Sequence, residues 1–153
     1  MTIRFAEPHE AGLVLDFIKK IAEYEKLLDE VICDEDTIYD SVFVKKEAEV
    51  IFVCEDEVPV GFALFFHNFS TFMGKKGLYL EDLFVIPEKR GKGYGKALFQ
   101  YLGRLANERG CKRFEWVCLN WNEPSIKFYK SFGAVPMDEW TTFRLSGNAL
   151  KNI

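Results

Sequence analysis

Apolar residues recur at helical spacing in two long stretches of the chain. In residues 9–28 the recurring apolar positions are Leu13, Phe17, Ile21, Tyr24 and Leu28. The second stretch follows a group of glycines and ends at Arg109, where Gly110 is a typical helix terminator. Its apolar face consists of Ala97, Leu98, Tyr101, Leu102, Leu105 and Ala106. Two shorter helices are predicted over residues 34–43, which open with an acidic turn, and residues 123–132, which Gly133 terminates.

Six shorter segments have the β-branched and aromatic composition that is typical of strands. They are Thr2–Phe5 and residues 50–54, 60–66, 78–85, 114–119 and 141–145. Residues 56–59 contain turn formers and should join the second and third segments into a hairpin. Several antiparallel strands followed by a strand–helix–strand–helix unit predict an α+β fold, in which helices pack on a sheet.

The length of 153 residues suits one domain, so we expect residues 1–153 to fold as a single unit. Hydrophobic residues make up 48% of the chain and include 15 phenylalanines, which is enough to build a core. No apolar run approaches the about 20 residues that span a bilayer, and the N-terminus lacks the apolar stretch of a signal peptide. We therefore expect a cytoplasmic protein with no membrane partner.

The cysteines and histidines do not form a metal-binding pattern. The four cysteines lie in separate segments without CxxC spacing, and the two histidines, His9 and His67, are far apart in the sequence. Metal ligation usually requires clustered Cys and His residues. We therefore expect the cysteines to be structural thiols, and we expect no metal centre.

The charges are distributed unevenly along the chain. Residues 1–60 contain 16 acidic and 6 basic residues, whereas residues 86–113 contain 8 basic and 2 acidic residues. Solvated faces are the ordinary explanation of such an asymmetry. The functional interpretation is a cationic ligand steered by the first segment and an anionic ligand bound by the second. A nucleic-acid partner is disfavoured, because a chain with a net charge of −4 offers no extended basic surface.

Residues 90–96, Arg-Gly-Lys-Gly-Tyr-Gly-Lys, lie between a predicted strand and a predicted helix. Glycines leave backbone N–H groups accessible to a ligand, and a helix N-terminus adds further N–H groups and the positive end of its dipole. Arg90, Lys92 and Lys96 add positive charge. The segment fits neither the Walker pattern nor the position of a Rossmann glycine motif. It predicts a pyrophosphate site of another type, and a glycine-rich turn without a ligand is the alternative.

The motif in residues 90–95 matches the Q/R-x-x-G-x-G/A motif of the GNAT acetyltransferases, whose backbone amides bind the coenzyme A pyrophosphate. Residues 22–26, 79–85 and 121–130 extend the match at the same spacings, and together they resemble the diamine (spermidine/spermine) N-acetyltransferase branch. The resemblance covers nearly the whole chain. It implies the GNAT acyl-CoA N-acyltransferase fold, with a mixed, mostly antiparallel central sheet flanked by helices. It also implies transfer of the acetyl group of acetyl-CoA to a primary amine of a small molecule.

The same resemblance implies the residues of the site. The coenzyme contacts would be Leu83, Phe84, Val85, Arg90, Gly91, Lys92, Gly93, Tyr94, Gly95, Lys96, Asn122, Glu123, Pro124 and Ser125. The acceptor amine would be bound by Tyr24, Glu25, Glu81, Asp82, Glu115, Trp116 and Val117. The backbone of residues 83–85 would pair with the pantetheine amides of the coenzyme.

Acetyl transfer to an ammonium group requires a proton acceptor and a proton donor. By the resemblance, Glu81 accepts the amine proton, directly or through water, and Tyr129 protonates the departing thiolate. Adjacent residues such as Glu81 and Asp82 point to opposite faces of a regular strand unless a bulge redirects one of them, and the resemblance implies a β-bulge in this strand. Asn122, Ser125 and Tyr129 have the spacing of one helix face. The structural alternatives are salt bridges for the two acids and a core position for Tyr129.

Residues 67–74, His-Asn-Phe-Ser-Thr-Phe-Met-Gly, depart from the polyamine enzymes, which have an acidic residue and a Trp where this chain has Ser70 and Phe72. A diamine or polyamine is the first expectation for the acceptor, and thialysine, a lysine-like compound or another small amine is the alternative. The resemblance also implies a homodimer. A non-catalytic acyl-CoA sensor on the same fold is an alternative of a different class, and the presence of both Glu81 and Tyr129 favours the enzyme.

Overall fold

The computed structural model describes all of residues 1–153, which form two compact units, Met1–Val117 and Cys118–Ile153. The first unit contains a five-stranded sheet with helices, and the second contains two short helices and irregular chain. The expected single domain over residues 1–153 stays a prediction.

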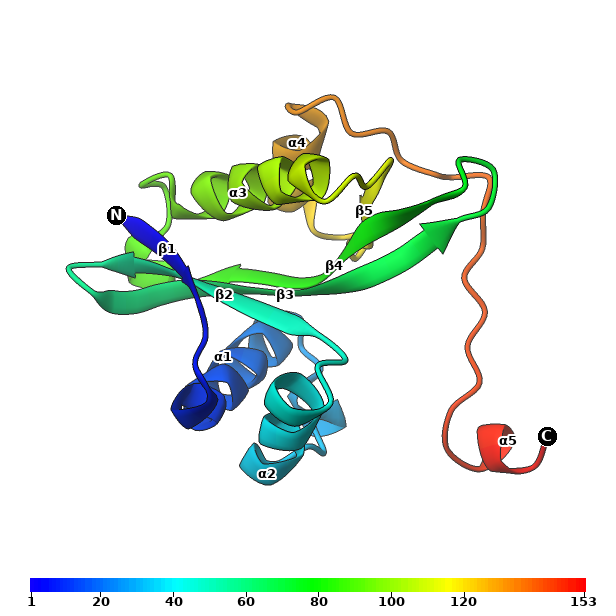
Figure 1. Cartoon of the computed structure of the whole chain (residues 1–153), viewed down its shortest axis with the longest axis horizontal. Helices are drawn as coiled ribbons and strands as arrows, with labels where there is room; N and C mark the ends of the chain where they lie inside the picture. Colours follow the sequence, from blue (N-terminus) through cyan, green and yellow to red (C-terminus); the bar gives the residue numbers. More distant parts are fainter. The chain divides into compact units, whose positions relative to one another are not determined.

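The strands of the sheet lie side by side in chain order. They are β1 (Thr2–Phe5), β2 (Glu49–Glu55), β3 (Val58–Ser70), β4 (Lys75–Val85) and β5 (Phe114–Trp116). The pairs from β1 to β4 are antiparallel, and β5 runs parallel to β4. The predicted α+β fold with a mixed, mostly antiparallel sheet is therefore confirmed (Figure 1).

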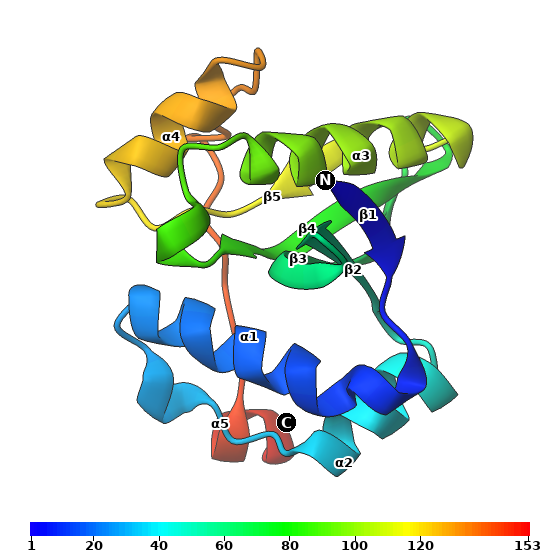
Figure 2. The same cartoon turned by 90° about the vertical axis from the view of Figure 1, so that its left-hand side faces the viewer.

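Helices cover both faces of this sheet. Helices α1 (Ala11–Tyr24) and α2 (Glu35–Ile38) lie on one face, and α3 (Tyr94–Glu108) lies on the other (Figure 1 and Figure 2). The shorter helical turns are η1 (Pro8–Glu10), η2 (Leu28–Glu30), the π-helical η3 (Tyr39–Val44) and η4 (Pro87–Lys89). None of the helices has the length and apolar character needed to cross a membrane.

Capping signals in the sequence explain where the helices begin and end. Asp34 caps α2, because its Oδ1 accepts a hydrogen bond from the Thr37 N–H at 2.8 Å. The helix predicted over residues 34–43 is α2 followed directly by η3. Helix α3 ends at Glu108, and Gly110 follows with a φ of +76°, in the left-handed region that terminates helices. Helix α1 ends earlier than predicted, since Lys26 turns the chain with a φ of +63°.

The core fixes the sheet from both faces. On the α1 face, the ring of Phe17 packs on the rings of Phe52 and Phe62, with centroid separations of 5.8 and 5.3 Å. Ile51 and Phe65 are fully buried as well. Because side chains alternate along a strand, these two lie on the face opposite Phe52 and Phe62, toward α3. The sheet is therefore packed on both of its faces.

The strand predicted over residues 141–145 is wrong. In the unit Cys118–Ile153 the regular elements are α4 (Glu123–Lys130) and α5 (Gly147–Lys151), and residues 141–145 are irregular and exposed. A strand needs a neighbouring strand to pair its backbone N–H and C=O groups, and this unit contains none. The predicted strand over residues 114–119 is shorter for a similar reason, since pairing with β4 ends at Trp116.

Candidate functional site

A β-bulge interrupts β4 at Glu81. Leu64 and Phe65 are consecutive in β3, but their partners in β4 are Asp82 and Leu80, so that Glu81 between them has no partner. In a regular strand Leu80 and Asp82 would lie on the same face, because side chains alternate. The bulge places Leu80 with Phe65 and Asp82 with Leu64, on opposite faces of the sheet. The bulge expected from the sequence is therefore confirmed.

Three carboxyl groups approach each other beside this bulge, and we call them the carboxylate cluster: Glu25, Glu81 and Asp82. Burial, with the neighbouring charges of Glu81 and Glu25, raises the pKa of Asp82 to about 7. Burial and the charge of Glu81 also raise the pKa of Glu25, which follows the last residue of α1. Glu81 is exposed, whereas Asp82 is half-buried. The cluster concentrates negative charge that a bound cation would relieve.

Arg90 connects the glycine-rich turn to α1. Its guanidinium lies over the ring of Tyr24 at 4.9 Å and over the ring of Phe84 at 5.1 Å from the centroids. Its Nε also donates a hydrogen bond to the carbonyl oxygen of Val85 at 3.0 Å. Sequence reasoning expected Arg90 to supply positive charge to a ligand, and the structure adds a second role in joining the turn, β4 and α1.

The glycine-rich turn leads into the N-terminus of α3. Gly91 and Gly93 have φ values of +77° and +89°, a conformation that glycine adopts without a steric penalty. The first internal hydrogen bond of the helix runs from the Ala97 N–H to the Gly93 oxygen, at 2.9 Å. The N–H groups of the preceding turn are therefore available to an anion, with exposed Lys92 and Lys96 beside them.

The last residues of β4 have one edge that no strand covers, and the Val85 oxygen already accepts the hydrogen bond from Arg90. On one side β4 pairs with β3 as far as Val85, opposite Gly61. On the other side its pairing with β5 covers only Leu78 to Leu80. The backbone of residues 83–85 therefore has an edge without a strand neighbour, next to the turn that opens α3. A ligand that carries amide groups can pair with such an edge.

Glu115 and Trp116, two of the predicted acceptor residues, lie on β5 and have local partners. Glu115 binds Arg113 through a 2.8 Å ion pair and accepts a hydrogen bond from Asn68 at 3.2 Å. The ring of Trp116 packs on Phe99 of α3, with a centroid separation of 5.0 Å. Val117 is exposed. Their role at an acceptor site stays a prediction.

The predicted general acid belongs to the unit Cys118–Ile153. Asn122 is the N-cap of α4, and Ser125 and Tyr129 lie one and two turns further along the helix, so that the expected common face exists. The rings of Phe128 and Tyr129 contact each other edge to face, with centroids 5.4 Å apart. The roles of Tyr129 and of residues 122–125 stay predictions.

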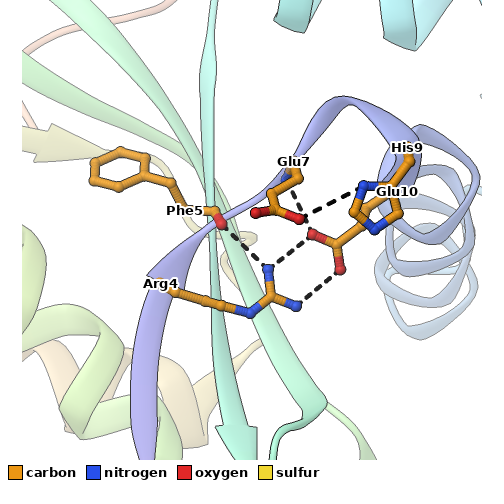
Figure 3. Close-up of polar contacts among 5 residues, drawn as sticks. All are labelled: Arg4, Phe5, Glu7, His9 and Glu10. Atoms are coloured by element: carbon orange, nitrogen blue, oxygen red, sulfur yellow. Dashed lines mark hydrogen bonds and ion pairs between the residues drawn. The ribbon is translucent and has the colours of Figure 1, made fainter.

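Glu7, His9 and Glu10 bring possible metal-ligand atoms within 4.8 Å of one another near the start of α1. Glu10 is already engaged, because both its oxygens accept hydrogen bonds from Arg4 at 2.8 Å (Figure 3). This contact is the main cause that lowers the pKa of Glu10 to about 2. The cluster therefore has a structural explanation, in which Arg4 joins β1 to the helix entry. The expectation that the protein needs no metal stays a prediction.

Sequence reasoning did not single out Glu55, which contacts the glycine-rich turn from the end of β2. It is one of the 16 acidic residues in residues 1–60, and nothing in its sequence surroundings distinguishes it. Only the antiparallel pairing of β2 with β3 brings the end of β2 to the end of β4.

Comparison with known proteins adds to this geometry. The model of the acetyltransferase (GNAT) family matches residues 15–134. A thialysine N-epsilon-acetyltransferase from Sus scrofa is 32% identical over 163 aligned positions, which cover 99% of this chain and 95% of that protein. A spermidine/spermine N(1)-acetyltransferase-like protein from Homo sapiens is 27% identical, over 97% of this chain and 23% of that protein. A solved integron cassette protein from V. cholerae has a TM-score of 0.81 and 30% identity, over 99% of this chain and 95% of its own.

The raised pKa of Asp82 predicts a pH-dependent stability. The folded protein binds this proton more tightly than the unfolded chain, so the group stabilises the fold below about pH 4, and this contribution is lost as the pH rises through about 7. Asp82→Asn should therefore melt at a higher temperature than wild type at about pH 8, and the difference should shrink toward about pH 4. Thermal unfolding across this range measures the effect. Asp16→Asn, on the exposed side of α1, is the control and should show no such trend; equal shifts in both variants would refute the assignment.

Proposed function

Because this chain belongs to the GNAT acetyltransferase family, we propose that it acetylates the terminal primary amine of a small cationic molecule of the thialysine or lysine type. The family and the relatives establish the coarser activity, an acetyl-CoA-dependent amine N-acetyltransferase. A non-catalytic acyl-CoA sensor is therefore set aside. The proposal concerns the acceptor, the residues that bind it and the path of the protons.

The carboxylate cluster is the observation that carries the proposal. Glu25, Glu81 and Asp82 lie close enough for their charges to raise the pKa values of Glu25 and Asp82. A primary ammonium group, with a pKa near 10.4, is positively charged at neutral pH and would compensate this charge. Tyr24 lies next to Glu25 in the chain, and the Arg90 guanidinium lies over its ring. The cluster thus favours a cationic acceptor over a neutral one.

The thialysine or lysine type is preferred over a diamine or polyamine for two reasons. The thialysine acetyltransferase matches at 32% identity over 95% of its length, against 27% over 23% for the spermidine/spermine-like protein. Residues 67–74 also lack the acidic residue that the polyamine enzymes have at the position of Ser70. That serine is buried, and its hydroxyl accepts a hydrogen bond from the Met73 N–H at 3.3 Å, within the hairpin turn. A diamine stays the second candidate, since the cluster would bind its ammonium group equally well.

In this proposal acetyl-CoA binds along the unpaired edge of β4 and across the glycine-rich turn. The pantetheine amides pair with the backbone of residues 83–85, and an N–H near Phe84 polarises the thioester carbonyl. The diphosphate lies against the N–H groups of residues 91–96, where Lys92 and Lys96 add positive charge. Residues 122–125 are proposed to complete the coenzyme contacts, on the strength of the sequence resemblance.

Glu81 is proposed to accept the proton of the acceptor amine. Deprotonating an ammonium of pKa near 10.4 at about pH 7.4 costs about 4 kcal/mol, so a nearby proton acceptor lowers the barrier. Glu81 is the bulged residue and is exposed, which lets it reach the amine directly or through a water molecule. The neutral amine then attacks the thioester carbonyl, and the tetrahedral intermediate collapses to the amide with loss of the thiolate and release of the second nitrogen proton to solvent.

Tyr129 is proposed to protonate that thiolate. A phenol with a pKa near 10 is protonated at neutral pH and can donate to sulfur. The common face of Asn122, Ser125 and Tyr129 on α4 supports the assignment, as does the sequence resemblance.

We also propose, from the same resemblance, that the enzyme is a cytoplasmic homodimer.

A panel of acceptors tests the proposed function. Thialysine, lysine, putrescine, spermidine and a basic peptide are each incubated with the enzyme and acetyl-CoA, and the released thiol is followed. The proposal predicts the highest kcat/KM for thialysine or lysine. A higher kcat/KM for putrescine or spermidine would show that the acceptor is a diamine or polyamine, the second candidate. A preference for the peptide would overturn the small-molecule assignment.

Gly95→Val should weaken acetyl-CoA binding more than about tenfold, because a branched side chain would cover the first-turn N–H groups. A Cβ at Gly95 would lie 3.8 Å from Val85 and 3.9 Å from Leu83, so the chain itself can accommodate it. Gly103→Val is a matched control, since it lies in the same helix with no atom within 4 Å of its Cβ position. Calorimetric titration compares the two variants. Equal affinities would show that the turn does not bind the coenzyme.

Tyr129→Phe should lower kcat by about 10²–10⁴-fold, the usual cost of a lost general acid, with little change in acetyl-CoA affinity. Only the hydroxyl is removed, so the ring can still pack on Phe128. Tyr39→Phe on η3, which is exposed, is the control and should keep the wild-type rate. Steady-state kinetics at saturating substrates gives the comparison, provided that chemistry limits kcat. A wild-type kcat in Tyr129→Phe would assign the proton donor elsewhere.

A further inference from the structure

Glu55 contacts both ends of the glycine-rich turn. It is the last residue of β2 and is half-buried. Its Oε1 accepts a hydrogen bond from the Tyr94 hydroxyl at 2.5 Å, and its Oε2 accepts one from the Lys89 ammonium. Lys89 is the last residue of η4 and Tyr94 is the first residue of α3, so that only residues 90–93 lie between them. One carboxylate on a neighbouring strand thus ties together the entrance and the exit of the turn.

The backbone of the turn does not fix its own shape. Gly91 and Gly93 both have positive φ, and no atom outside their immediate neighbours lies within 4 Å of their Cβ positions. Glycine has more conformational freedom than any other residue, so the directions of these N–H groups depend on what anchors the flanks. Arg90 supplies one anchor through its hydrogen bond to Val85. Glu55 supplies an anchor on each side of the glycines.

The protonation states of this contact are stable around neutral pH. The hydrogen bond to Glu55 is the main cause that raises the pKa of Tyr94 to about 12. The hydrogen bond from Lys89, followed by that from Tyr94, lowers the pKa of Glu55. The carboxylate is therefore ionised while the Tyr94 hydroxyl keeps its proton. The ring of Tyr94 is only 6% exposed, so the hydroxyl has a fixed position from which to donate.

We propose that Glu55 is a positioning residue for the acyl donor, and that it acts through Lys89 and Tyr94 to hold the turn in the conformation that binds the diphosphate of acetyl-CoA. The proposal rests on the proposed function, in which the turn binds this diphosphate. Glu55 touches neither the ligand nor the reacting atoms. It restricts the conformations of the turn before acetyl-CoA binds. The turn then loses less conformational entropy on binding, and this increases affinity.

Electrostatics alone would give Glu55 the opposite effect. The charge of Lys92 contributes to lowering the pKa of Glu55, so the carboxylate is within electrostatic range of the turn. A negative charge at that range repels a diphosphate. If charge were its whole contribution, Glu55→Gln would bind acetyl-CoA more tightly than wild type. A positioning role predicts weaker binding, so the sign of the change separates the two.

The experiment compares Glu55→Gln, Tyr94→Phe and the double variant by calorimetric titration with acetyl-CoA and by steady-state kinetics. Tyr94→Phe should raise the Kd and the KM for acetyl-CoA by about tenfold, the effect of one lost hydrogen bond to a charged group, and Glu55→Gln, which removes the charge from both contacts, should raise them at least as much. Because Glu55 is not involved with the reacting atoms, kcat of Glu55→Gln at saturating acetyl-CoA should stay within about twofold of wild type. The double variant should bind acetyl-CoA little more weakly than Glu55→Gln alone, since the contact between Glu55 and Tyr94 is shared by both substitutions.

Glu57→Gln is the matched control, because it removes the same charge from the nearby exposed β2–β3 turn. It should leave the affinity unchanged. Suppose that wild type binds acetyl-CoA and that both variants keep the wild-type melting temperature. Unchanged or tighter binding in Glu55→Gln and Tyr94→Phe would then overturn the positioning role, while the proposed function would stand. If wild type itself failed to bind acetyl-CoA, both the proposed function and this inference would fall.

Discussion

In β4, Leu80 and Asp82 lie opposite consecutive residues of β3, and Glu81 between them has no partner. The rest of the site depends on this one extra residue. It turns Asp82 to the face that α1 covers. There the negative charge of Glu25, at the end of α1, helps to raise the pKa of Asp82. Without the bulge, Leu80 and Asp82 would share a face, and either an apolar residue or a carboxylate would be misplaced.

Beyond the bulge, the same strand leads into a region of opposite charge. Its last residues have an edge that β5 does not cover, and the chain then enters the glycine-rich turn and the N-terminus of α3. A cation is therefore favoured at the bulge and an anion at the turn, on either side of an edge that can pair with amide groups. Arg90, stacked on Tyr24 and bonded to Val85, connects the two regions. This arrangement suits an amine acceptor and a long, anionic acyl donor.

The sequence predicted what is encoded locally and missed what depends on distant partners. Helix α3 and its terminator Gly110 follow from periodicity and from glycine conformation, and the bulge is expected from the resemblance to the GNAT acetyltransferases. Residues 141–145 alternate like a strand but lack a pairing partner in their unit, which no local pattern reveals. The contact of Glu55 with Tyr94 exists only because antiparallel pairing brings the end of β2 to the end of β4.

The most direct test of the central claim is the pH dependence of kcat/KM for the acceptor amine, in wild type and in Glu81→Gln. This quantity reports the ionisable groups of the free enzyme and the free amine. If Glu81 accepts the amine proton at the bulge, wild type should lose activity as the carboxylate is protonated at low pH. Glu81→Gln should be slower, and its low-pH limb should lie at lower pH, because the charge of Glu81 no longer raises the pKa of Asp82 and of Glu25. A Glu81→Gln profile with the wild-type rate and the wild-type limb would contradict the account.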